Sequence, residues 1–376
     1  MRDKAGTRDA FWTKVAISPL CSSPKRAVTT HRTGSSTEPA LFAVLVAFVA
    51  DARAVTINWV SVGSSGNPAD TVVMTSDGTT GYGSIGYNYN IGKYDVTNAQ
   101  YAEFLNSNDP TGANALGLYH SAGMADPDYG GISYNSAAVS GSKYSIIPGN
   151  GNHPVNFVSW YDGARFANWL NNGQVAGATE TGAYTFGPLD ISGEPINGET
   201  ITRNPGATIV LASENEWYKA AYFNPATNSY FKYPTSSDTA PTADIPSATP
   251  NTANFASAVR APTDVGAYTG TTSPFGAFDM AGNLEQWLEP SADDKTRGFR
   301  STSYGSGSFQ MLSSARDSID PRRGFNVQTA GMPLRRRTDG GRPLKNGDDA
   351  GLAKGEWSQP MKSCLHLVTR APRRAA

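Results

Sequence analysis

The residues best suited to chemistry lie at 279–287, which read D-M-A-G-N-L-E-Q-W. This stretch shows neither the 3.6-residue apolar period of a helix nor the alternation of a strand. A Gly-Asn pair beside Asp279 and Gln286 offers carbonyl and side-chain oxygens in an irregular loop, which suits a hard cation such as Ca²⁺. The alternative is a purely structural loop whose Trp287 fills a core.

Cysteine and histidine are too scarce for several other kinds of site. The two cysteines, Cys21 and Cys364, lie near the two ends, so we expect neither a disulfide framework nor a thiolate metal site in the body of the chain. Of the four histidines, only His120 and His153 lie in that body, too few for a three-histidine metal centre. A Ser-His-Asp hydrolase would depend on one of the same two residues as its base.

Charge is distributed unevenly along the 376 residues. Residues 1–39 hold seven Lys/Arg and three Asp/Glu, and residues 328–376 hold ten and four, so the overall net charge of −1 leaves residues 40–327 at −11. An acidic body between basic ends argues against a nucleic-acid partner, because such a protein would carry its positive charge on the folded face.

An apolar run at 41–50 predicts a secretory signal. It is too short to span a bilayer, it follows Arg32, and Ala52-Arg53-Ala54 has the small-x-small pattern of a signal-peptidase site. We therefore expect a signal peptide at 40–54, preceded at 1–39 by a disordered, over-extended N-terminus. A buried helix in an unusual extension is the alternative. The mature protein would have no transmembrane segment and would be secreted, periplasmic or on the cell surface.

Four ordered motifs resemble those of the sulfatase-modifying-factor family, the formylglycine-generating enzymes and their relatives. Residues 279–287 resemble the family's D-M-x-G-N-V-x-E-W. Upstream, 94–101 (YDVTNAQY) resemble its opening helix, 153–162 (HPVNFVSWYD) its P-V-x-x-V-S-W-x-D segment, and 211–217 (LASENEW) its L-P-T-E-x-E-W segment. The resemblance implies one domain at 55–327 with the family's variant of the C-type lectin fold. This is an irregular, loop-rich α+β structure with few short helices and antiparallel sheets.

The resemblance also implies a chemistry for which this chain lacks the thiols. Formylglycine-generating enzymes oxidise a substrate cysteine with dioxygen, using two cysteines that hold copper(I), for which thiolates are suitable soft ligands. Counted from the serine of the family's R-G-G-S segment, those positions are Ser306 and Met311. We therefore expect no copper and no catalytic residues. A second, iron-dependent branch of the family needs more histidines than His120 and His153.

Calcium is the cofactor that the resemblance favours, as a weak structural ion. The family's ligands would correspond to Asp279, Gly282, Leu284 and Gln286, mostly through backbone carbonyls. At the last position the family has a glutamate; Gln286 keeps an oxygen but lacks the charge, so affinity should fall to a Kd on the order of 10⁻⁴–10⁻³ M. A second family site would begin at Asn254, although its aspartate position is Ser257.

Three helix starts should position these segments. Thr97 with Gln100, Ser159 with Asp162, and Ser213 with Glu216 have the spacing of capping boxes, in which side chains and backbone amides pair reciprocally. After the second start, Ala164, Ala167 and Leu170 share one helical face. Residues 55–60 and 87–91 alternate as strands. The second of these argues that the GxGxxG at 81–86 is a set of turns, because a dinucleotide-binding loop must open a helix.

The remaining segments are expected to be loops and a tail. Stretches 106–152 and 224–252 are rich in Gly, Ser, Thr, Asn and Pro, and such long loops are usually functional or mobile. The family's closing G-F-R-V-A strand reads G-F-N-V at 324–327, followed by a basic stretch at 328–376. We expect 328–376 to be a disordered tail, and a change of reading frame would explain it.

Together these observations predict a secreted, non-catalytic domain of this family that binds an unknown protein or glycan, in effect a pseudoenzyme. The alternative is an oxidase-type enzyme that converts a substrate cysteine to formylglycine through a site not visible in the sequence.

Overall fold

The computed structural model describes residues 54–190, 195–293, 296–322, 334–336, 363–364 and 368–369. All of them belong to one compact unit, Ala50–Ala376. The predicted segment 1–39 and almost all of the predicted signal peptide lie outside the described residues, as do 324–327 and most of the predicted tail. Within the described part of the chain, no helix has the length and apolar character that crossing a membrane requires.

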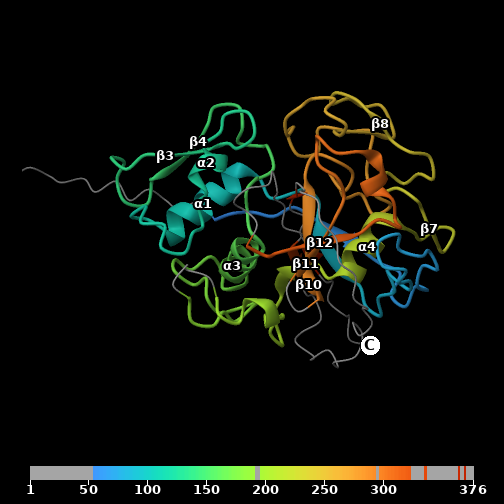
Figure 1. Ribbon diagram of the computed structural model, residues 1–376, viewed down its shortest axis with the longest axis horizontal. Helices are drawn as coiled ribbons and strands as arrows, with labels where there is room; N and C mark the ends of the chain where they lie inside the picture. The colour runs from blue at the N-terminus through green and yellow to red at the C-terminus, as the bar shows by residue number, and fades with distance from the viewer. Residues whose placement is uncertain are drawn as a thin grey trace, which may run out of the picture. The chain divides into compact units, whose positions relative to one another are not determined.

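Helices are few and short, as predicted. They are α1 (Asn98–Asn108), α2 (Ser121–Met124), α3 (Trp160–Asn171) and α4 (Glu214–Tyr222), with 3₁₀ turns at η1 (Gly198–Thr200) and η2 (Ser308–Met311). In the view of Figure 1, α1 and α2 lie with β3 and β4 in one region (teal), apart from the orange strands β10–β12.

The strands form small sheets. The described strands are β1 (Trp59–Val62), β2 (Tyr89–Gly92), β3 (Ile132–Tyr134), β4 (Tyr144–Ile146), β5 (Ile209–Leu211), β6 (Phe223–Asn224), β7 (Ser229–Tyr230), β8 (Thr242–Ala243), β9 (Thr252–Ala253), β10 (Glu285–Asp293), β11 (Thr296–Arg300), β12 (Asp317–Ile319), β13 (Leu334–Arg336), β14 (Ser363–Cys364) and β15 (Val368–Thr369). Most pairs are antiparallel; β8 with β9 and β10 with β14 are parallel. The predicted loop-rich α+β class is confirmed, and it is consistent with a C-type-lectin-like fold.

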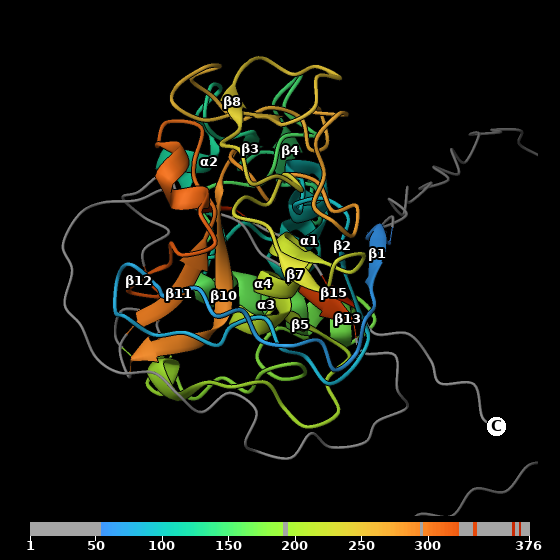
Figure 2. The ribbon, with the colours of Figure 1, turned by 90° about the vertical axis from the view of Figure 1, so that its right-hand side faces the viewer.

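Two of these sheets carry the candidate site. One has the order β12-β11-β10-β14 and the other β1-β2-β13-β5, with β15 also pairing with β2. The signature at 279–287 leads directly into β10, which Figure 2 shows beside its antiparallel neighbour β11. Three short strands, β13–β15, fall inside the segment predicted as a tail. β13 lies between β2 and β5.

All three predicted capping boxes are present. Thr97, Ser159 and Ser213 are the N-caps of α1, α3 and α4, and each box is closed by the residue three positions later. A helix begins at each of these places because the box satisfies amides that lack a partner in the first turn, which stabilises it by roughly 1 kcal/mol.

Helix α3 is buried on every side rather than on one face. Ala164, Ala167 and Leu170 are in the core as expected, but so is the rest of the helix from residue 160 to residue 170. The aromatic rings of Phe104 on α1 and Phe166 on α3 meet edge-on at 5.3 Å, and β5 packs on α3 as well. The helix is therefore a central support and not a surface element.

Two tryptophans join β10 to the beginning of α3 and the residues just before it. The Trp160 indole N–H donates to the carbonyl of Leu288 at 2.9 Å, and the Trp287 indole N–H donates to the carbonyl of Val158 at 3.0 Å. Both side chains are fully buried. Each indole therefore fills the core and satisfies its own donor at the same junction.

Several buried carboxylates form ion pairs with arginine. The Arg300 guanidinium on β11 bonds Glu214 at the start of α4, and Arg316 reaches the other oxygen of the same carboxylate at 3.2 Å. Arg203 bonds both Glu216 and Glu289. These pairs tie α4 to the β10–β12 sheet and give each of the carboxylates Glu214, Glu216 and Glu289 a cationic partner.

The two predicted long loops contain short elements. Segment 106–152 holds α2, β3 and β4, and segment 224–252 holds β7 and β8. These elements have two to four residues, and the connections between them remain irregular.

Candidate functional site

The signature bends sharply before β10 begins. Asp279, Gly282 and Asn283 all have left-handed backbone conformations, with φ of 59°, 78° and 67°. A Cβ on Gly282 would lie 2.4 Å from the carbonyl oxygen of Asn254, so only glycine allows this close approach. The prediction that 279–287 is neither helix nor strand is confirmed for 279–284 and is wrong for 285–287, which begin β10.

Asn283 links the bend to two other loops. Its side-chain oxygen accepts from the Thr263 amide at 2.9 Å and from Asn254 Nδ2 at 3.2 Å, and its Nδ2 donates to the Thr263 carbonyl. Its own amide donates to the Asn254 carbonyl at 2.7 Å. Asn283 is 2% exposed, so this residue organises the site internally and presents nothing to solvent.

Asp279 is a carboxylate in a poorly solvated place. Burial raises the pKa of Asp279 to about 7, and the hydrogen bond from the Gly266 amide, 2.8 Å long, opposes this only partly. Its side chain keeps some exposure.

Gln286 has a fixed orientation. Its Oε1 accepts from the Trp217 indole N–H at 2.5 Å, and its Nε2 donates to the Asp279 carbonyl and to Asp95 Oδ1, both at 3.0 Å. An indole N–H can only donate, and a carbonyl and a carboxylate can only accept, so all three partners require the same orientation of the amide.

These contacts bear on the predicted calcium site. The structure brings Asp279, Gly282, Leu284 and Gln286 into one bend, and Asn254 bonds to it. The one predicted side-chain ligand does not fit a cation, because the Gln286 oxygen faces Trp217 and its N–H group faces the carbonyl of Asp279. Within the described ranges, no group of three or more His, Cys, Asp or Glu residues is arranged to hold a metal.

Asn254 presents a different situation. Its side chain is 1% exposed and its Nδ2 donates to Ala261 and Asn283, but Oδ1 has no hydrogen-bond partner among the described residues. A buried oxygen without a partner would fit a water or a cation. Calcium prefers six to eight oxygen ligands, and Asn254 supplies one, so calcium at Asn254 stays a prediction.

Ser306 and Met311 are the positions that the sequence resemblance predicts for the family's two thiols. Ser306 Oγ and Ser303 Oγ lie 2.9 Å apart in a hydrogen bond. Met311 is fully buried in a small apolar cluster with Phe255 and Ala281. The Met311 sulfur therefore serves packing, as expected for a methionine that fills a core gap.

A cavity lies beside the signature, and sequence reasoning missed it. Its volume is about 360 Å³. The lining combines the start of α1, the segment that precedes β1 and two loops: Ile57, Asn58, Tyr94, Asp95, Thr97, Gln100, Asn152, Asp264 and Val265. Both charged residues in this lining are acidic. Asp95 is the residue that Gln286 bonds, so the cavity and the signature share a carboxylate.

His153 stands next to this cavity. Its Nε2 lies 3.5 Å from Asp264 Oδ1. Burial lowers the pKa of His153, and the Asp264 charge opposes this. His120 lies elsewhere, against the ring of Phe157, and burial lowers its pKa too.

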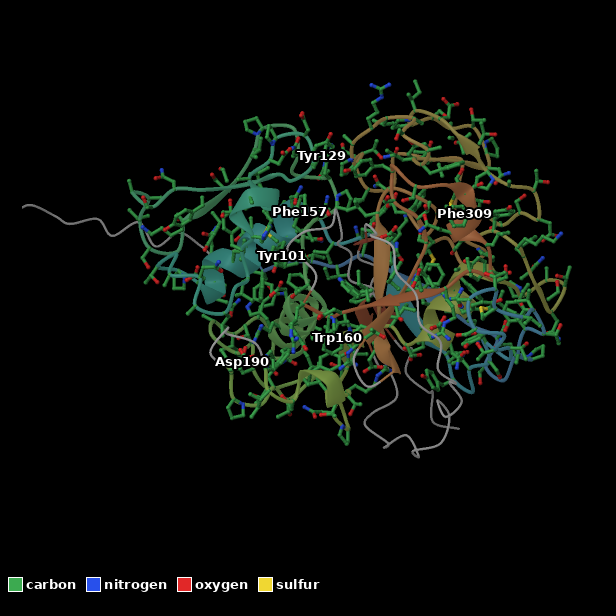
Figure 3. All side chains as sticks on the ribbon, viewed as in Figure 1. Tyr101, Tyr129, Phe157, Trp160, Asp190 and Phe309 are labelled. Carbon is green, nitrogen blue, oxygen red and sulfur yellow. The ribbon has the colours of Figure 1, made fainter. Side chains whose placement is uncertain are left out.

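One aromatic residue of the first long loop, Tyr129, lies against Tyr304 in the Ser303–Ser306 segment. The rings of Tyr129 and Tyr304 stack 5.9 Å apart, 9° from parallel. Phe157 has φ of 65°, which is unusual for an aromatic residue, and its ring covers Gly123. In Figure 3, Tyr129 and Phe157 lie toward α1 and α2, whereas Phe309 lies on the other side of the β10–β12 strands. Phe309 is 66% exposed.

Comparison with known proteins supports the resemblance seen in the sequence. Residues 71–347, more than half of the chain, match the model of the sulfatase-modifying factor enzyme 1-like domain. The chain belongs to this family. None of the curated proteins matches it.

Among solved structures, the chain is similar to three proteins of low sequence identity. CarF shares 20% identity with a TM-score of 0.42, covering 75% of this chain and 98% of that one. Variable protein 1 of Treponema denticola shares 16% (TM-score 0.42; 75% and 95% covered), and PvdO of Pseudomonas aeruginosa shares 18% (TM-score 0.39; 74% and 92% covered).

Proposed function

We propose that this member of the family is a secreted binding module that does not carry out the family's oxidation. The observation that carries the proposal is the chemistry at the two thiol positions. Ser306 is hydrogen-bonded to Ser303, and Met311 is enclosed among apolar side chains. Neither supplies the thiolate that copper(I) needs, and a single buried thioether is a weak substitute.

The cavity beside the signature supports the binding part of the proposal. Its volume of about 360 Å³ is in the range of small-molecule sites. Asp95 and Asp264 can accept hydrogen bonds, and Asn58, Gln100 and Asn152 carry amides that both donate and accept. Such a lining suits a hydroxyl-rich ligand, such as a glycan, better than an apolar one.

A turnover assay tests the catalytic half. The purified full chain is incubated with a cysteine-containing sulfatase peptide, copper and dioxygen, and the peptide is then weighed by mass spectrometry. We expect the thiol to remain. Loss of the thiol together with gain of an aldehyde would establish the alternative, an oxidase-type modifying enzyme, and an active formylglycine-generating enzyme serves as the positive control.

A ligand screen tests the binding half. Glycans are screened by thermal shift against the wild type and against Asp264→Asn, which removes one negative charge from the lining of the cavity. Asp128→Asn, at another exposed aspartate, is the matched control. We expect at least one glycan to raise Tm in the wild type and the control and to lose about ten-fold in affinity in Asp264→Asn. The absence of any shift, or an equal shift in all three, contradicts this site.

Export is proposed on the sequence pattern at 40–54. N-terminal sequencing of the protein recovered outside the cytoplasm should begin at Val55. Recovery of an unprocessed chain inside the cell contradicts this part.

A further inference from the structure

The amide of Gln286 is bonded to oxygens from two different segments. In a calcium loop, several oxygens converge because a positive charge holds them together. Here the Asp279 carbonyl and the Asp95 carboxylate converge on the Gln286 amide nitrogen, each at 3.0 Å. The N–H group carries partial positive charge and supplies one hydrogen to each oxygen.

The opposite end of the same amide is held as firmly. The Trp217 indole on α4 donates to Gln286 Oε1, and both side chains are fully buried. A glutamate in this orientation would keep the bond to Trp217, but its second oxygen would face Asp95 and the Asp279 carbonyl. Three oxygen atoms would then meet without a hydrogen or a cation between them, which is costly at a buried position.

We propose that in this chain the Gln286 side chain replaces the cation at the signature, so that the bend at 279–286 is closed by a neutral amide cross-link. The cross-link joins three elements: α4 through Trp217, the segment before α1 through Asp95, and the bend itself through Asp279. It is independent of the proposed function, because it concerns only how the signature is held.

The decisive variant is Gln286→Glu. In EDTA we expect its Tm to lie several degrees below that of the wild type, because the oxygen cluster has lost its donor. Millimolar Ca²⁺ should recover most of this difference. By isothermal titration calorimetry, the variant should bind one more Ca²⁺ per chain than the wild type.

Gln174→Glu is the matched control. The Gln174 amide also bonds one acceptor and one donor, the carbonyl and the amide of Val55, and the substitution adds the same charge away from the signature. It should leave the number of bound Ca²⁺ ions unchanged. Equal calcium stoichiometry in the wild type and Gln286→Glu would overturn the proposal.

If Gln286→Glu does not fold, Gln286→Met tests the proposed cross-link instead. Met has a similar volume and forms none of the three hydrogen bonds. The cross-link requires its Tm to fall by the same amount in EDTA and in Ca²⁺. A fall seen only in Ca²⁺ would mean that the wild-type amide oxygen is a calcium ligand, and the proposal would be wrong. A cation bound near Asn254 would not affect this comparison, because it would be bound in the wild type and in Gln286→Met alike.

Discussion

Protonation of Asp162 should make the stability of this protein depend on pH. This carboxyl closes the capping box of α3, where it accepts hydrogen bonds from the Ser159 amide at 3.0 Å and hydroxyl at 2.6 Å. Burial raises the pKa of Asp162 from 3.8 to about 6, and the Ser159 hydrogen bonds and the Arg165 charge offset burial only in part. The perturbation is the substitution Asp162→Asn, which keeps an acceptor oxygen but cannot ionise.

The sign follows from proton binding. Below pH 3.8 this group is protonated in both states and contributes no pH dependence. Between 3.8 and about 6 the unfolded chain loses its proton while the folded chain retains it, so the free energy of unfolding falls as pH rises. Above that window the effect is constant. A difference of about two between the pKa values corresponds to about 3 kcal/mol.

Urea unfolding of the wild type and Asp162→Asn at several pH values from 4 to 7 measures this effect. We expect the stability difference between the two to move by about 3 kcal/mol in favour of the variant as pH rises across the window. Glu103→Gln, at an exposed carboxylate on α1, controls for the loss of one charge. Parallel pH profiles for the wild type and Asp162→Asn would refute the reasoning.

Two further substitutions test the packing around the signature. Gly282→Ala places a Cβ 2.4 Å from the Asn254 carbonyl oxygen, so it should lower the free energy of unfolding in urea by more than about 2 kcal/mol. Gly276→Ala is the control, because it has a similar positive φ but open space around it, and it should cost about 1 kcal/mol. Equal losses in the two variants would contradict the close approach at Gly282. Arg300→Met leaves Glu214 buried without its closest partner and should cost about 3–5 kcal/mol, and a loss below 1 kcal/mol would show that the pair matters little to stability.

Local features of the fold could be predicted from the sequence because their causes are local. A capping box depends on two residues three positions apart, so Thr97, Ser159 and Ser213 could be identified as helix starts without knowing what the helices contact. The face predicted for α3 was incomplete for the opposite reason. Its other sides are covered by elements distant in sequence, and the spacing of apolar residues within the helix does not predict those contacts.

The candidate site was predictable in its location and not in its contacts. The oxygen-rich bend at 279–287 could be located from residue types and from the family motif. The sequence suggested that Gln286 would offer its oxygen to a cation, but its partners Trp217 and Asp95 are 69 and 191 residues away and determine which end of the amide faces the bend. The cavity combines four distant segments, so Asp95 and Asp264 carried no local indication of a shared role.

The two indole hydrogen bonds between β10 and the region where α3 begins give this protein a built-in optical probe. Trp160 and Trp287 are both fully buried, and both are hydrogen-bonded across one junction. Opening of that junction would expose both indoles to water and shift their fluorescence emission to longer wavelength. Because the chain holds seven tryptophans, the contribution of this junction is the difference in emission between the wild type and variants in which Trp160 or Trp287 is replaced with phenylalanine. The order in which emission and far-ultraviolet circular dichroism change during unfolding would then show whether the junction opens before the helix melts.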